Sequence, residues 1–119
     1  MKIQTYIWPD DATVFQPDGA TIPFVKYVEN GETIIGFDSQ MCIPPEPMVN
    51  AMIALKMLDT PHVKVIMVNH RSPVGLLAKV AENYEINEEK LEGEAVKLTF
   101  SYKEGATEQA DLSNSRCGG

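Results

Sequence analysis

Cys42 is the residue whose position most directly suggests chemistry. It follows the extended segment 33–38 and precedes a proline run at 44–47 that is predicted to open a helix. Unpaired N–H groups and the dipole at a helix N-terminus stabilise a thiolate, so Cys42 is a candidate persulfide or redox thiol. A small buried hydrophobic residue is the alternative interpretation, because Met41 and Ile43 flank this cysteine with apolar side chains.

His70 is the second candidate, since it follows a predicted central strand, 63–69, and precedes a predicted helix, 73–84. Ligands tend to bind at the C-terminal ends of strands in such sheets. An adjacent parallel strand would bring Asp38 and Cys42 to the same edge, where the three side chains would form a metal site or a polar pocket. A histidine that closes a turn through backbone hydrogen bonds is the alternative. No further histidine–cysteine spacing supports a metal, so no metal or cofactor is assigned.

The predicted working face is the edge formed by the two turns that lead into the helices. Arg71 would hold an anion at this edge, or else remain a solvated charge. The residues assigned to it are Asp38, Ser39, Pro44, Pro45, Glu46, Pro47, His70, Arg71 and Pro73.

The chain ends in Cys117-Gly118-Gly119, which supplies the second candidate thiol. A terminal Gly-Gly is similar to the tail of ubiquitin-like sulfur carriers, but the proline-marked helix does not follow that fold's element order. A disulfide between Cys117 and Cys42, or a mixed disulfide, remains a hypothesis. Self-sufficient catalysis is not expected, because a Gly-rich phosphate loop, a nucleophile signature and paired carboxylates in a recognisable cleft are missing.

Periodicity and turn signals predict the elements that position these side chains. Asn30-Gly31 between the apolar runs 23–28 and 32–37 predicts a β-hairpin. A β-α-β-α-β-β core of the α/β (α+β) class then follows, with two helices on one face of a mixed sheet in a two-layer sandwich. The expected strands are 1–8, a short one around Val14-Phe15, 23–28, 33–38, 63–69, 84–90 and 94–102, and the expected helices are 48–58 and 73–84. The expected parts of the chain are a β-rich N-terminal extension at 1–32, the core at 33–102 and a disordered tail at 103–119.

The predicted helix 48–58 is apolar almost all round, and such a helix is normally covered on more than one face. The sheet supplies one cover. The N-terminal extension or a second copy of the chain supplies the other. A buried helix in a monomer and a homodimer formed through this helix are therefore both open.

Composition and charge limit the classes of partner. The chain has 119 residues, 44% of them hydrophobic, which suits one globular domain. A net charge of −7 argues against nucleic-acid and anionic-membrane surfaces. No apolar run approaches the roughly 18 residues that span a bilayer, and a signal peptide is not apparent. A cytoplasmic protein with reduced thiols and a protein partner is expected.

A family resemblance rests on Pro44-Pro45-Glu46-Pro47-Met48, followed by His70, Arg71 and Pro73. These residues resemble a small domain of unknown function with a Pro-Pro-Glu-Pro-Met segment and a His-Arg-Pro-like turn, which is similar to the TusA-like sulfur carriers. The resemblance covers 33–102 and implies a TusA-like core acting as a carrier or interaction module, linked to sulfur or redox chemistry. Carriers of that fold hold a persulfide on the cysteine of Cys-Pro-x-Pro. Here Pro44 occupies that place, and Cys42 lies two residues earlier.

Three functional hypotheses follow. The first is a non-catalytic carrier or interaction module that docks on a protein partner. The second is a small-ligand or metal-binding module that uses the edge of Asp38, Cys42 and His70. The third is a structural homodimer formed through the apolar helix 48–58.

Overall fold

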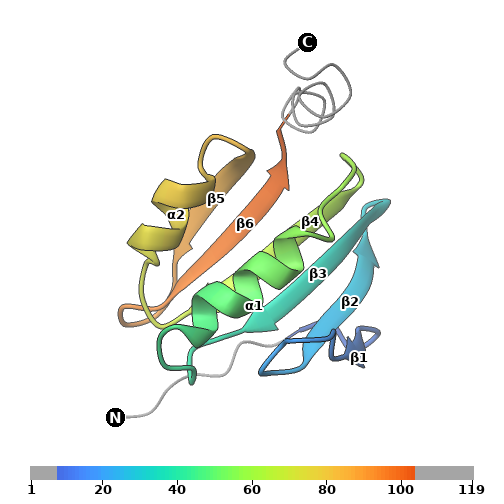
Figure 1. The fold of residues 1–119 in the computed structure, drawn as a ribbon. Coiled ribbons are helices and arrows are strands. Elements are labelled where there is room, and N and C mark those ends of the chain that lie inside the picture. Colours follow the sequence, from blue (N-terminus) through green and yellow to red (C-terminus); the bar gives the residue numbers. More distant parts are fainter. Residues whose placement is uncertain (1–7, 104–119) are drawn as a thin grey trace.

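The computed structural model describes residues 8–103 and has an α+β fold. A mixed six-stranded sheet, curled into a half-barrel, carries two helices in the order β-β-β-α-β-α-β-β (Figure 1). The predicted α+β class is therefore confirmed. The elements are β1 (Thr13–Phe15), β2 (Phe24–Glu29), β3 (Glu32–Asp38), α1 (Glu46–Leu55), β4 (Val63–Asn69), α2 (Val74–Val80), β5 (Tyr84–Lys90) and β6 (Val96–Tyr102).

The strand order is β1-β2-β3-β4-β6-β5, and only β3 and β4 are parallel within the described sheet. This pairing is parallel because α1 carries the chain back across the sheet between the two strands. Phe37 is in register with Met67, and Asp38 with Val68. The turns that follow β3 and β4 therefore begin at the same edge of the sheet.

The main core lies between the sheet and the two helices. Side chains alternate along a strand, so every second residue of β3, β4 and β6 points toward the helices. Phe37 stacks on Phe24 of the neighbouring strand, with ring centroids 4.9 Å apart and planes inclined by 19°. The buried members of this core are Phe24, Ile35, Phe37, Ala51, Ala54, Leu55, Leu58, Val65, Met67, Leu76, Val80, Val96, Leu98 and Phe100.

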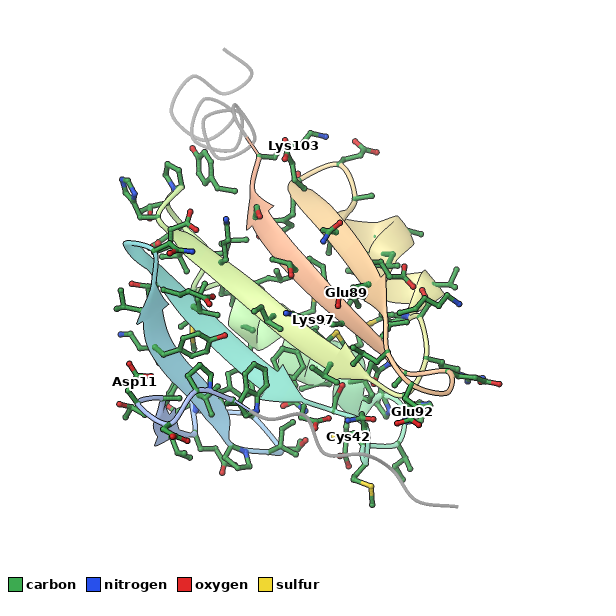
Figure 2. The ribbon with its side chains drawn as sticks, turned by 180° about the vertical axis from the view of Figure 1, so that it is seen from behind. Asp11, Cys42, Glu89, Glu92, Lys97 and Lys103 are labelled. Carbon is green, nitrogen blue, oxygen red and sulfur yellow. The ribbon has the colours of Figure 1, made fainter. Side chains whose placement is uncertain are left out.

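The opposite face of the sheet has an apolar half and a polar half. On the apolar half Trp8 lies over Gly36, where an added Cβ would come within 2.5 Å of the indole ring, so only glycine fits without a shift. On the polar half, Glu89 of β5 is in register with Lys97 of β6, as Figure 2 shows from behind. The buried residues of the apolar half are Val25, Tyr27, Ile34, Ile66 and Val68.

The hairpin at Asn30-Gly31 and all the predicted strands from 13 onward are present. Both helices are shorter than predicted. The helix expected at 48–58 begins at Glu46 and ends at Leu55, because the N–H groups of Met57 and Leu58 bond to carbonyls three residues back. The helix expected at 73–84 ends at Val80, and β5 begins directly at Tyr84. The rest of the strand predicted at 1–8, and the tail predicted from 104 on, lie outside the described residues.

The loop between β1 and β2 supplies the second cover of α1. The N–H of Thr21 donates to Oδ1 of Asn50 at 2.9 Å, and Nδ2 of Asn50 donates to Oγ1 of Thr21 at 2.9 Å. Gly19, with a φ of +87°, lies against Ile53 on the next turn of the helix. The N-terminal extension is therefore the cover, which was one of the two alternatives. Within residues 8–103, neither helix is long and apolar enough to cross a membrane.

Candidate functional site

A groove of about 540 Å³ lies where the turn after β3 meets the turn after β4. The parallel pairing of the two strands creates this meeting point, since both turns leave the same edge of the sheet. The two predicted halves of the working face are thus brought together. The lining residues are Pro44, Pro45, Pro47, Met48, Asn69, His70, Arg71, Ser72, Pro73, Val74, Gly75 and Leu76.

The prolines set where α1 begins. The helix has proline in its first turn, where the missing N–H costs nothing, and Glu46 adds a carboxylate at the positive end of the dipole. Neither α1 nor α2 has a side-chain cap. Before α2, the Ser72 hydroxyl lies 3.3 Å from Oε1 of Glu88, and Pro73 occupies the N-cap position.

Ser39 and Asn69 hold the two turns together beneath the groove. The Ser39 hydroxyl is fully buried and lies 2.9 Å from the carbonyl oxygen of Val68 and 2.8 Å from Oδ1 of Asn69. Nδ2 of Asn69 donates to the carbonyl oxygen of Arg71 at 2.9 Å. Ser39 was assigned to the binding edge, and this assignment is wrong because its hydroxyl is enclosed and already bonded. Its role is to fix the turn that presents His70.

Asp38 closes the turn after β3 and does not line the groove. Its carboxylate accepts hydrogen bonds from the backbone N–H of Gln40 at 3.0 Å and from Nε2 of Gln40 at 3.1 Å. This is the Asx-type use of an aspartate at a strand end. Asp38 was predicted to contribute to a ligand pocket, but its carboxylate stabilises the turn after β3 instead.

His70 has a buried Nδ1 without a hydrogen-bond partner within the described part of the chain. A buried polar atom without a partner costs about 1–3 kcal/mol. The alternative prediction was that His70 closes its turn through backbone hydrogen bonds, but Nδ1 does not do so, and Asn69 supplies a bond across this turn. His70 lines the groove, and its Nδ1 is an enclosed polar atom that no described protein group satisfies.

Cys42, which Figure 2 labels, is buried with 7% of its surface exposed. Glu46 and Thr21 are its side-chain hydrogen-bond partners. Burial, the neighbouring Glu46 carboxylate and Asp38 raise the pKa of the Cys42 thiol, and the Thr21 hydroxyl only partly offsets them. The prediction of a thiolate at the helix N-terminus is therefore not favoured, because desolvation and the neighbouring negative charges stabilise the protonated thiol. The alternative, a small buried hydrophobic residue, describes Cys42 better.

The metal interpretation of Asp38, Cys42 and His70 also fails. Among residues 8–103, no three histidine, cysteine, aspartate or glutamate side chains come close enough to hold a metal ion. The cysteine faces Glu46 and Thr21, whereas the histidine lines the groove. Cys117, the other candidate thiol, lies outside the described residues.

Exposed apolar side chains at the starts of the two helices, of which Met48 and Val74 line the groove, are the feature that the sequence did not predict. Of seven large apolar side chains exposed in the described structure, five belong to the turn before α1, the first turn of α1 or the start of α2. The sequence placed two of them over Cys42 and the others on covered helix faces. A signal was available, because apolar residues stand just before and after the proline run 44–47 and at the first position of α2. The five are Met41, Ile43, Met48, Val49 and Val74, with exposed fractions of 77%, 69%, 37%, 39% and 72%.

The raised pKa of the Cys42 thiol predicts a loss of stability at alkaline pH. The folded chain holds this proton more tightly than the unfolded chain, so the stabilising contribution is complete below the ordinary pKa of 9.0 and is lost as pH rises through the folded value. We expect melting temperatures between about pH 8 and about pH 10.5 to fall more steeply for the wild-type chain than for Cys42→Ala. Burial also raises the pKa of Tyr84. Because both proteins contain Tyr84, its effect cancels when the two melting curves are compared. Parallel curves would contradict this assignment.

Comparison of the chain with protein-family models, with curated proteins and with solved structures found no match. The TusA-like resemblance therefore stays a prediction from the residues quoted above.

Proposed function

We propose that this chain is a non-catalytic protein-interaction module whose groove binds an extended segment of a partner protein. The observation that carries the proposal is that two exposed apolar side chains, Met48 and Val74, line one groove, while three more, Met41, Ile43 and Val49, lie next to its lining residues in sequence. Exposed apolar side chains scattered singly are ordinary, but a cluster beside a concave surface is typical of an interaction site. The partner is a protein rather than a nucleic acid or an anionic membrane, because the chain carries a net charge of −7.

We also propose that residues 33–102 are a TusA-like core in a two-layer arrangement. The order of elements from β3 to β6, β-α-β-α-β-β, supports this assignment. Of the roles that the resemblance implies, docking is favoured over sulfur carriage. A persulfide on Cys42 would need an accessible thiolate, and the thiol is buried beside a carboxylate.

Homodimer formation uses the same surface and is the competing function. Met48 and Val49 are the α1 residues that remain exposed once the β1–β2 loop covers the rest of the helix. A second copy of the chain would have to seat on these two side chains. Light scattering of the purified chain decides between the two occupants.

The test is a selection of displayed random peptides against the full chain, followed by affinity measurement on two matched variants. Val74→Glu places a charge at the groove, and Val28→Glu places the same charge on β2, where the valine is 66% exposed compared with 72% for Val74. We expect Val74→Glu to weaken the selected peptides at least tenfold and Val28→Glu to change their affinity less than twofold.

Three outcomes would overturn the proposal. They are a library that enriches no peptide, peptides whose affinity does not respond to Val74→Glu, and a wild-type dimer that Val74→Glu converts to a monomer. The last of these assigns the groove to a second copy of the chain. Circular dichroism of both variants controls for loss of fold, which is not expected because both valines are exposed.

A further inference from the structure

We infer that the segment bound in the groove carries the side-chain carboxylate of an aspartate or glutamate, held by Arg71 and by the buried Nδ1 of His70. This inference rests on the proposed function, since it names the chemistry of the partner at the same site. The rest of the interface is apolar. The carboxylate contact adds a polar interaction that fixes the register of the bound segment.

The charge of the groove lining favours a negatively charged ligand group. Arg71 is the only permanently charged residue that lines the groove, and no acidic residue does. Its guanidinium forms no ion pair within residues 8–103, and the residue is exposed. Guanidinium groups pair with carboxylates through two parallel hydrogen bonds, so an uncommitted arginine in a groove favours a carboxylate ligand. In a chain with a net charge of −7, this cation is a local exception.

The residue before Arg71, His70, contributes an unpartnered nitrogen. Nδ1 of His70 is buried without a hydrogen-bond partner in the described structure, and His70 follows Asn69, whose amide fixes the turn. A carboxylate has lone pairs enough to accept from both an imidazole N–H and a guanidinium. If the imidazole shifts so that Nδ1 opens to the groove, one ligand carboxylate would accept from this nitrogen and pair with Arg71 together.

The acidic residues beside the groove favour a carboxylate over a phosphate. Glu88 lies beside the groove, where Oε1 is 3.3 Å from the Ser72 hydroxyl, and Glu46 lies at the start of α1 between two lining prolines. These carboxylates repel a dianionic phosphate about twice as strongly as a monoanionic carboxylate at the same place. The neighbouring apolar side chains, Met48 and Val74, require an aliphatic residue beside the acidic one.

The experiment uses a synthetic peptide from the selection described above and its glutamate-to-glutamine form (or aspartate-to-asparagine form). On the wild-type chain we expect the neutral form to bind roughly tenfold more weakly. On Arg71→Gln we expect the two forms to bind within about twofold of each other, because the charge has lost its partner. Lys79→Gln, an equal change of charge on α2 outside the groove, should preserve the tenfold difference.

The two histidines of the chain provide a second readout that a structural role of Arg71 would not move. Nitrogen NMR of the labelled protein should show the Nδ1 resonance of His70 shifting when the acidic peptide is added. The resonances of His62, on the loop before β4, should stay in place. A His70 resonance that does not respond removes this nitrogen from the proposal.

The inference fails if selected peptides are not enriched in acidic residues, or if the charged and neutral forms bind wild type equally. It also fails if amidating the peptide's C-terminus, rather than neutralising its side chain, causes the loss, since a terminal carboxylate would then be the ligand. In each case peptides that still respond to Val74→Glu leave the proposed function intact. Absence of any groove-dependent peptide would instead remove both.

Discussion

Replacing Phe37 by alanine is expected to lower the free energy of unfolding by about 3–5 kcal/mol. The side chain is 1% exposed, lies in β3 next to the parallel partner strand β4, and stacks on Phe24. Truncation removes the transfer free energy of the ring and leaves a cavity beneath α1 that rigid strands on both sides cannot close. Because domains of this size are stable by about 5–15 kcal/mol, this one change consumes a large part of the total.

Urea denaturation followed by circular dichroism measures the effect of Phe37→Ala. Phe15→Ala is the matched control, because Phe15 lies on the three-residue edge strand β1, is only partly buried and makes an edge-to-face contact with Phe24 at 6.0 Å. We expect the control to lose less than half as much stability as Phe37→Ala. Equal losses would mean that the edge strand contributes as much to folding as the centre of the sheet.

Replacing Asn69 by aspartate is expected to cost about 2–5 kcal/mol at neutral pH. Asn69 is 3% exposed, accepts from the Ser39 hydroxyl and donates its amide to the carbonyl oxygen of Arg71. The aspartate carboxylate can still accept from the Ser39 hydroxyl, but it has no N–H to donate to the Arg71 carbonyl. A carboxylate oxygen therefore faces the carbonyl oxygen of Arg71 in a buried site. The turn that carries His70 and Arg71 should loosen, and peptide binding should weaken with it.

The pH dependence separates this mechanism from simple loss of packing. A buried carboxyl has a raised pKa, so the penalty of Asn69→Asp should shrink as pH falls and the protonated group again donates to the Arg71 carbonyl. Asn69→Ala, which has no titrating group, should show a constant penalty over the same range. Asn83→Asp in the exposed turn before β5 should change stability by less than about 0.5 kcal/mol. A penalty independent of pH for Asn69→Asp would contradict the buried-carboxylate explanation.

The order and type of the elements follow from local signals along the chain. Asn30 has a φ of 53° and Gly31 a φ of 80°, and few other residue types accept such values in a two-residue hairpin turn. Prolines at 44–47 start a helix because that position needs no N–H donor. A helix between two strands then favours their parallel pairing, so the meeting of the proline turn and the His70 turn was predictable from short-range patterns.

The surroundings of individual side chains were decided by segments distant in sequence. Met41, Cys42 and Ile43 are three successive apolar residues, and nothing local indicates that the middle one is buried beside Glu46 and Thr21 while its neighbours face solvent. Thr21 belongs to the loop that also covers α1, so its contact with Cys42 cannot be predicted from the residues near Cys42 in sequence. Strand period and turn chemistry act over a few residues, whereas burial and pKa depend on what the completed fold brings within contact distance.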